Sequence, residues 1–195
     1  MGIETVRQFF AEHAPDVNIE VLETSTATVQ LAADALDVAP GQIAKTLAFK
    51  VGEKPLLIVA SGNARIDNRK IRDTFGGKAK MLDAETVMEL TSHPVGGVCP
   101  FGLATNLPVY CDESLHAYDE VLPAAGSSNS AVRLSPKRLA ELVNAEWVDV
   151  CRLPESDYLL SSQANAKHLE TSIEQYHSGQ TKQCPLMDEQ QFKNR

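Results

Sequence analysis

Two parts of the sequence combine residue types that can act on an anionic or carbonyl-containing substrate. Lys45 stands at the entrance of the apolar run Ile43–Val51, where an ammonium is unfavourable to bury unless an anion or carbonyl oxygen meets it. The segment Gly96–Gly102 holds three glycines and a proline within seven residues. It predicts a fixed, exposed backbone whose N–H groups can point at a ligand oxygen. Each feature also has a plainer interpretation, as a strand-end lysine that reaches water and as an ordinary structural loop.

Other reaction chemistries have weaker support. The sequence holds no GxSxG elbow, Walker loop, HExxH pair or dinucleotide fingerprint. Cys99 could be a thiol nucleophile with His93 or His116 as its base, although a lone cysteine is more often a small buried hydrophobe. A metal site built from His93, Cys99, Cys111 and His116 lacks compact ligand spacing, so we expect no metal and no other cofactor. The carboxylates of 20–23 and 112–113 are more typical of solvated edges than of a glycosidase pair.

Composition and charge limit the partners. The 195 residues are 43% hydrophobic with a net charge of −8, which argues against non-specific nucleic-acid binding, and we expect no DNA partner. Six cationic residues nevertheless lie between Arg65 and Lys80, opposed only by two aspartates. They form either a solvated helix face or a phosphate-contacting patch, whose candidates are Arg65, Arg69, Lys70 and Arg72. Without a long apolar run or a signal-peptide pattern, we expect no membrane partner and a cytoplasmic location.

The elements that must position these residues follow from periodicity, caps and turns. Helices and strands alternate irregularly, and 43–51 with 55–60 forms a hairpin pattern around Gly52. This order favours an α+β fold with a mixed sheet over a doubly wound parallel fold. From residue 153 the chain becomes polar, and we interpret 153–195 as a tail with room for one helix. We expect five helices: one over 3–13, one that Ser25 or Thr26 caps and that ends at Leu36, one that Asp67 caps and that ends at Phe75, one over 83–91 and one that Ser135 opens and that ends at Leu142. Further strands are expected over 19–23, 79–82, 109–111, 120–122, 131–134 and 147–150.

Three motifs in register resemble the YbaK/EbsC family, which comprises prolyl-tRNA synthetase-associated editing domains and their free-standing relatives. Ala32–Leu47 is similar to that family's lysine region, and Gly96–Gly102 to its G-x-x-x-P-x-G loop. Gly126–Pro136 resembles the strand that precedes its final helix. The similarity extends from about Ile3 to Arg152 in the same order. Residues 1–152 are thus expected to form one editing domain with a mixed, partly closed, barrel-like sheet wrapped by helices.

The resemblance implies hydrolysis of mischarged aminoacyl-tRNA, with a tRNA(Pro)-type tRNA as the first candidate and prolyl-tRNA synthetase as a candidate partner. Lys45 becomes the essential lysine, and its amine should open into the same cleft as the Gly97 and Gly102 backbone. The alternative is a non-catalytic tRNA- or synthetase-binding module that retains the editing fold. This chain lacks the basic residues that cysteinyl-tRNA(Pro) deacylases carry after the loop and near Ser128. The candidate substrate-binding residues are Thr46, Gly96, Gly97, Pro100, Phe101, Gly102, Ser128 and Asn129.

Overall fold

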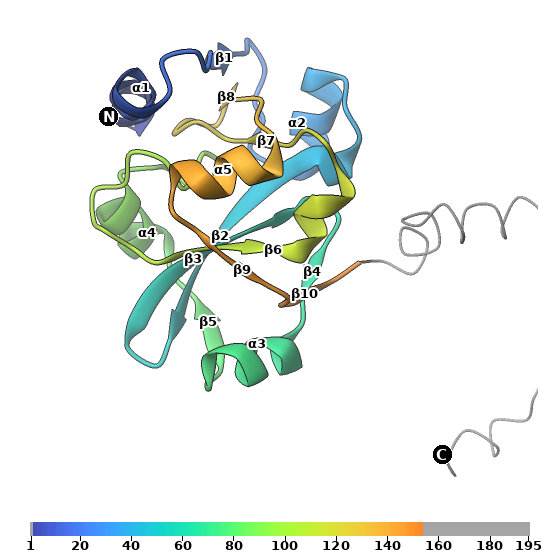
Figure 1. The fold of residues 1–195 in the computed structure, drawn as a ribbon. Coiled ribbons are helices and arrows are strands. Elements are labelled where there is room, and N and C mark those ends of the chain that lie inside the picture. Colours follow the sequence, from blue (N-terminus) through green and yellow to red (C-terminus); the bar gives the residue numbers. More distant parts are fainter. Residues whose placement is uncertain (1, 154–195) are drawn as a thin grey trace, which may run out of the picture. The chain divides into compact units, whose positions relative to one another are not determined.

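The computed structural model describes residues 2–153, all within Met1–Pro154, the first of the two units into which the chain divides. Its centre is a mixed sheet in which β2 (Ile43–Val51) and β3 (Lys54–Ser61) form a long antiparallel hairpin (Figure 1). The expected tail over 153–195 lies outside the described residues, apart from Leu153. The other strands of this sheet are β5 (Ala79–Met81), β6 (Val109–Asp112), β7 (Leu122–Pro123) and β9 (Glu146–Val148).

The main sheet is open. Its order is β5-β2-β3-β6-β9, with β7 beside the first residues of β2, and the outer strands β5 and β9 do not pair with each other. Two small antiparallel ladders lie apart from it: β1 (Glu20–Val21) with β8 (Ser130–Ala131), and β4 (Arg65–Ile66) with β10 (Cys151–Arg152). The expectation of a partly closed, barrel-like sheet is therefore not supported, because these ladders do not join the two edges. The α+β class with a mixed sheet is confirmed.

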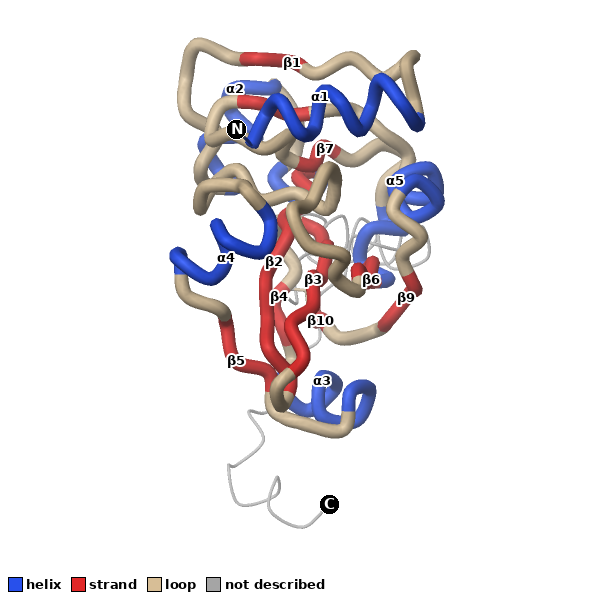
Figure 2. Tube along the Cα trace, turned by 90° about the vertical axis from the view of Figure 1, so that its left-hand side faces the viewer, coloured by secondary structure: helices blue, strands red, loops and turns tan. Residues whose placement is uncertain are grey.

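Helices surround the sheet at both ends of the domain. The helices α1 and α2 lie at one end with β1, and α3 lies at the other end near β5 and the hairpin turn (Figures 1 and 2). The helices are α1 (Gly2–His13), α2 (Val29–Leu36), α3 (Asn68–Phe75), α4 (Ala84–Thr91) and α5 (Pro136–Leu142), with short 3₁₀ turns at Pro40–Gln42 and Glu113–Ala117.

Side-chain caps set where these helices begin. The Asp67 carboxylate accepts the N–H groups of Arg69 and Lys70, and Ser135 Oγ accepts that of Arg138, as the sequence predicts. The cap of α2 is Thr28 rather than Ser25 or Thr26, because those two side chains are tied to the Ser128 carbonyl instead. The α2 helix therefore begins two residues later than a cap at Thr26 would place it.

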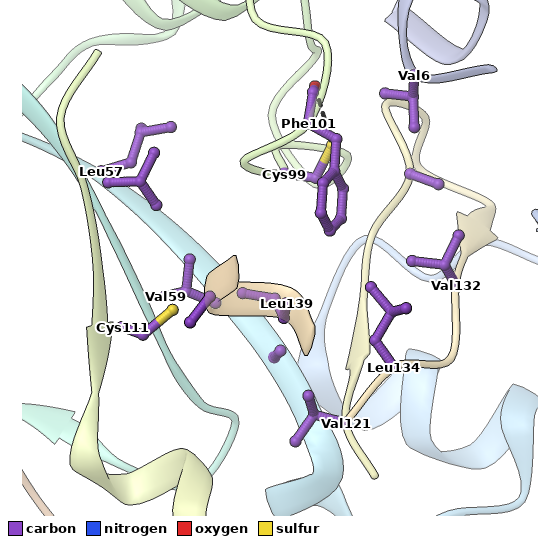
Figure 3. Close-up of a cluster of buried hydrophobic side chains, with 14 of the residues drawn as sticks. Val6, Leu57, Val59, Cys99, Phe101, Cys111, Val121, Val132, Leu134 and Leu139 are labelled. Atoms are coloured by element: carbon purple, nitrogen blue, oxygen red, sulfur yellow. Dashed lines mark hydrogen bonds between the residues drawn. The ribbon is translucent and has the colours of Figure 1, made fainter. Parts of the chain in front are cut away.

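The largest buried cluster lies where the sheet meets α1, α5 and the loop that follows α4. Figure 3 shows Leu57 and Val59 of β3 facing Phe101, Cys99 and Leu139 across this core, and all five side chains are fully buried. Each buried leucine or phenylalanine contributes about 1.5–3 kcal/mol to folding. The core thus anchors the end of the loop Pro94–Gly102 to the centre of the domain.

Candidate functional site

A cavity opens at a break in the pairing of β2. One edge of β2 pairs with β3 without interruption from Ala44 to Val51. The other edge pairs with β7 at Ile43 and Ala44 and with β5 from Phe49 onward. A cavity of about 410 Å³ lies beside the residues in between, a volume within the usual range of small-molecule sites.

The cavity wall is mostly apolar. The longest continuous part of the wall is 43–48 of β2, which residues of α2 and β7 adjoin, and Thr26, Thr28, Thr46 and Ser130 carry hydroxyl groups. Among the described residues that line it, Lys45 alone carries a charge. Such a wall suits a ligand with an apolar portion and a small number of polar atoms. The apolar lining comprises Ala27, Val29, Ala32, Leu36, Ile43, Ala44, Leu47, Ala48, Met81, Leu82, Val87, Val95, Val98, Leu122, Ala124 and Ala131.

Lys45 lies on β2 with its ammonium held by backbone oxygens. Its Nζ donates to the carbonyl of Gly62 at 2.9 Å and to the carbonyl of Ala64, both just beyond the end of β3. Burial away from water lowers the pKa of Lys45, and nearby Arg65 acts in the same direction. An ammonium has three N–H donors, and the carbonyls of Gly62 and Ala64 use two of them.

Thr46 is the neighbouring candidate, and it also lines the cavity. Its Oγ1 atom is buried and has no hydrogen-bond partner among the described residues. A buried hydroxyl without a partner is unfavourable by about 1–3 kcal/mol, so such groups are uncommon in native proteins. Thr46 therefore presents an unused polar group at the break in the sheet.

The glycine-rich loop meets the cavity through its first residues. Gly96 and Val98 line the cavity, whereas Gly97 is packed against the backbone of Ser127. The Gly97 N–H donates to the Pro94 carbonyl at 2.9 Å, and the Gly97 carbonyl accepts from Gly126 N–H at 3.1 Å. The amide of Gly97 is thus already used inside the protein, and the loop amides beside the cavity are those of Gly96 and Val98.

The second half of the loop faces the core. Pro100 is buried, and the Phe101 ring packs on Phe10 with 4.8 Å between ring centroids (Figure 3 shows Phe101 in the core). Gly102 has a φ of +57°, and a Cβ there would lie 2.5 Å from the Thr5 carbonyl oxygen. Lys45 and Gly96 therefore border one cavity. The other loop candidates do not line it and pack against the rest of the protein: Gly97, Pro100, Phe101 and Gly102.

Ser128 and Asn129 hold the opposite wall without lining the cavity. The Ser128 carbonyl accepts from the backbone N–H of Thr26 at 2.6 Å and from its hydroxyl at 3.2 Å. The Asn129 side-chain amide donates to the Leu22 carbonyl at 2.8 Å. These bonds fix the segment before α2, and Thr26, Ala27 and Thr28 of that segment line the cavity.

The basic candidates lie on β4 and α3, toward the other end of the domain from α1 and α2 (Figures 1 and 2). Lys70 is engaged internally, since its Nζ donates to Asp149 at 2.6 Å and to the Cys151 carbonyl at 2.8 Å. Arg69 is largely exposed, with only a 3.9 Å contact to Asp73. Arg69 and Arg72 are therefore better placed than Lys70 to reach a phosphate.

The thiol and metal alternatives do not fit the geometry. Cys99 is fully buried, and burial raises the pKa of its thiol to about 12, so it is not a thiolate at neutral pH. His93 Nδ1 lies 3.7 Å from Cys99 Sγ, but both groups are enclosed in protein. His116 is half exposed and pairs with Glu113 at 2.9 Å. Within residues 2–153 no three His, Cys, Asp or Glu side chains gather as metal ligands.

Sequence reasoning missed much of the cavity wall. Thr28 and Ser130 carry no catalytic pattern, and Val29, Ala32 and Leu36 are predicted only as the inward face of a helix. The periodicity of α2 correctly identifies that face, but it does not show that part of the face borders a cavity instead of the core.

No described helix is long and apolar enough to cross a membrane.

Comparisons with known proteins identify similar sequences and structures. The family model described as an aminoacyl-tRNA editing domain matches residues 23–142, which include β2 and the glycine-rich loop. The uncharacterized protein YwhH of Bacillus subtilis (strain 168) is 47% identical over 154 residues, covering 78% of this chain and 98% of YwhH. A solved structure described as "a putative trans-editing enzyme for prolyl tRNA synthetase" superposes with a TM-score of 0.73 at 34% identity, covering 77% of this chain and 97% of that one.

This chain is also similar to one part of a longer enzyme. A proline–tRNA ligase of Aquifex aeolicus (strain VF5) is 28% identical over 148 residues, which are 74% of this chain and 24% of the ligase. This chain therefore corresponds to about a quarter of that enzyme. From the extent of the family match, the chain belongs to the aminoacyl-tRNA editing domain family. The family that the three sequence motifs resemble is thereby confirmed.

Proposed function

We propose that this protein is a trans-editing hydrolase that removes the amino acid from mischarged aminoacyl-tRNA. The observation that carries the proposal is that Lys45, Thr46 and Gly96 border one apolar cavity in a chain of the editing-domain family. The apolar wall accepts an amino-acid side chain, and the polar groups at the break in β2 face the acyl linkage. A tRNA(Pro)-type substrate and prolyl-tRNA synthetase as partner are supported by the relatives named above.

The proposed reaction is ester hydrolysis. Water attacks the carbonyl carbon, the bond between that carbon and the ribose oxygen breaks, and the products are a free amino acid and a ribose hydroxyl, which takes a proton. An aminoacyl ester is already activated, so roughly 4–8 kcal/mol of barrier reduction is sufficient. The third N–H of Lys45 and the amides of Gly96 and Val98 are the donors proposed to stabilise the developing negative charge. Water or the neighbouring ribose hydroxyl completes the proton transfer.

The direct test is a deacylation assay on a panel of tRNAs, including tRNA(Pro), mischarged with small and medium-sized amino acids. We expect the full-length protein to hydrolyse at least one member far faster than buffer does. We expect Lys45→Ala to lower that rate by at least about 100-fold, which corresponds to about 2.7 kcal/mol. If every member of the panel stays charged, the deacylase proposal is wrong and the binding-module alternative replaces it.

The controls separate chemistry from folding. Lys50 lies on the same strand, pairs with Glu53 at 2.7 Å and does not line the cavity, so Lys50→Ala should keep full activity. Removing Lys45 leaves the carbonyls of Gly62 and Ala64 without their donor, and Lys45→Arg supplies donors to them again. A purely structural lysine would leave Lys45→Arg fully active, whereas the proposal expects a loss of at least tenfold because the guanidinium is planar and larger.

A further inference from the structure

On the edge of β2 that borders the cavity, the break in pairing leaves one residue, Thr46, without a partner strand. β7 pairs with β2 as far as Ala44, and on the other side of the break the Leu82 N–H donates to the Ala48 carbonyl at 3.0 Å. Within residues 2–153 no strand pairs with this edge of β2 between those two points. Of the residues in this break, 45–47, Thr46 is the one whose main-chain N–H and C=O point to this edge.

Strand geometry gives the direction of the Thr46 main chain. In an antiparallel ladder, the N–H and C=O groups of successive residues point alternately to the two edges of the strand. The Ala48 carbonyl points to the edge shared with β5, because it accepts from Leu82. Thr46, two residues earlier, therefore presents both its N–H and its C=O to the same edge, beside the cavity that it lines.

The Thr46 side chain adds a second, independent observation. Its Oγ1 is buried and unpartnered among the described residues, at the same position as the unpaired main-chain groups. Thr46 thus brings an N–H donor, a C=O acceptor and a hydroxyl to one point of the cavity wall, and none of the three has a partner within residues 2–153. A ligand that satisfies them must carry an acceptor and a donor at the spacing of one amino-acid residue.

We propose that Thr46 binds the main-chain atoms of the aminoacyl group, which adds to β2 as a strand of one residue. This inference rests on the proposed deacylase function. The Thr46 N–H donates to the ester carbonyl oxygen, and the α-ammonium of the substrate donates to the Thr46 carbonyl, as two residues do in an antiparallel hydrogen-bonded pair. The Thr46 N–H is then a backbone donor to the oxygen on which negative charge develops.

The proposal defines a substrate requirement. The site recognises an α-amino acid ester with a free amino group, and it reads the side chain only through the fit to the apolar wall. Acetylating the amino group removes the charge and places an acyl group against β2. A 2-hydroxy acid ester replaces the ammonium with a weaker donor. Both changes should lower turnover even when the side chain is unchanged.

The first test observes binding without turnover. The probe is 3′-deoxy-3′-(L-alanylamino)adenosine, whose amide resists hydrolysis, and its control is the same compound with an acetylated amino group. In amide NMR spectra of the full chain, we expect the probe to shift the Thr46 N–H resonance and to slow its hydrogen exchange. We expect the acetylated control to bind at least tenfold more weakly. Absence of binding, or saturation binding that leaves the Thr46 amide unchanged, would overturn the proposal.

The second test uses turnover of the same protein. For the amino acid that the panel shows to be removed fastest, the N-acetylated aminoacyl-tRNA should be hydrolysed at least tenfold more slowly than the aminoacyl-tRNA with a free amino group. Equal rates would refute the role of Thr46 while leaving the deacylase function intact. Failure to hydrolyse any aminoacyl-tRNA would instead refute the proposed function, and the NMR experiment would still decide whether Thr46 binds the aminoacyl group.

Two variants of Thr46 separate the side chain from the main chain. Thr46→Val removes the hydroxyl but keeps both backbone groups, so we expect a rise in KM of about threefold to tenfold. Thr46→Pro removes the N–H, which points away from β3, so the β2–β3 hydrogen bonds remain and proline is tolerated on such an edge. We expect Thr46→Pro to lower kcat by about 100-fold. If Thr46→Pro folds and keeps the kcat of the wild type, the N–H has no role.

Discussion

Two buried side-chain polar atoms of the described residues have no hydrogen-bond partner: Thr46 Oγ1 and His93 Nε2. They differ in their surroundings. Thr46 lines the cavity, whereas His93 is fully buried behind the glycine-rich loop and accepts the Cys99 N–H through Nδ1 at 3.4 Å. The first group is free to meet a ligand, while the second supports the loop and makes folding sensitive to pH.

The pH dependence of stability follows from His93. Burial lowers the pKa of His93 from 6.5 to about 4, so the folded protein keeps it neutral. Above pH 6.5 the folded and unfolded chains both hold it neutral. As the pH falls from 6.5 toward 4, only the unfolded chain takes up a proton there, and the free energy of unfolding decreases. We expect His93 to account for a loss of about 2 kcal/mol between pH 7 and pH 4.5.

Urea denaturation at the two pH values measures this effect. Carboxylates also titrate in this range, so the comparison is with His93→Gln, which has no ionisable group and should lose about 2 kcal/mol less between the same pH values. If wild type and His93→Gln lose the same stability, His93 does not carry the pH dependence.

At the scale of elements, the loop Pro94–Gly102 is held by close backbone contacts on both sides. A Cβ on Gly97 would lie 2.5 Å from the Ser127 carbonyl carbon, and one on Gly96 would lie 2.8 Å from the Ala27 Cβ. Backbone atoms of the 126–129 turn cannot move without disturbing the bonds from Ser128 and Asn129 to the segment before α2. The glycines therefore join two walls of the cavity.

We expect Gly97→Ala to push the loop away from the backbone of Ser127, because the added Cβ would collide with it. We expect at least a tenfold loss of deacylation and a lower melting temperature, measured by the tRNA assay and by thermal denaturation. Gly77→Ala is the matched control, because a Cβ there would meet only the Val51 side chain at 3.0 Å, away from the cavity. Full activity in Gly97→Ala would show that the close packing of this loop is not needed for function.

At the scale of the whole molecule, charge is distributed unevenly. The chain is acidic overall, yet α3 and the strands beside it carry the cationic cluster between Arg65 and Lys80. This cluster continues into β5, and Met81 and Leu82 at the end of β5 line the cavity. A tRNA whose 3′ end enters the cavity could therefore place its phosphates along α3.

Charge reversal tests this arrangement. We expect Arg69→Glu combined with Arg72→Glu to raise KM for mischarged tRNA at least fivefold and to reduce the salt dependence of binding, because phosphate contacts release counterions. Hydrolysis of a 3′-aminoacyl adenosine ester, which has no phosphate, should be unchanged. The control is Lys137→Glu on α5, where the side chain is 85% exposed. Equal KM values for the double variant and the control would exclude α3 from the tRNA surface.

Local patterns predicted most elements well. The hairpin of β2 and β3, the Asp67 and Ser135 caps and the helix that ends at Gly76 all depend on neighbouring residues, and the structure confirms them. The strand expected over 131–134 is shorter, because only Ser130 and Ala131 pair with β1, and beyond them only Leu134 forms an isolated bridge, with Val121. The β4–β10 ladder was missed, since each strand is two residues long and their pairing is non-local.

The sequence by itself determined the helices, the hairpin, the place of Lys45 on an apolar strand, the glycine-rich loop and the family. The tertiary structure alone decided which of these residues meet. The gap at Thr46 exists because β7 and β5, distant segments of the chain, stop pairing on either side of it. Gly97 likewise needs to be glycine because Ser127 lies against it. These features arise from contacts between residues far apart in the chain, which no local pattern records.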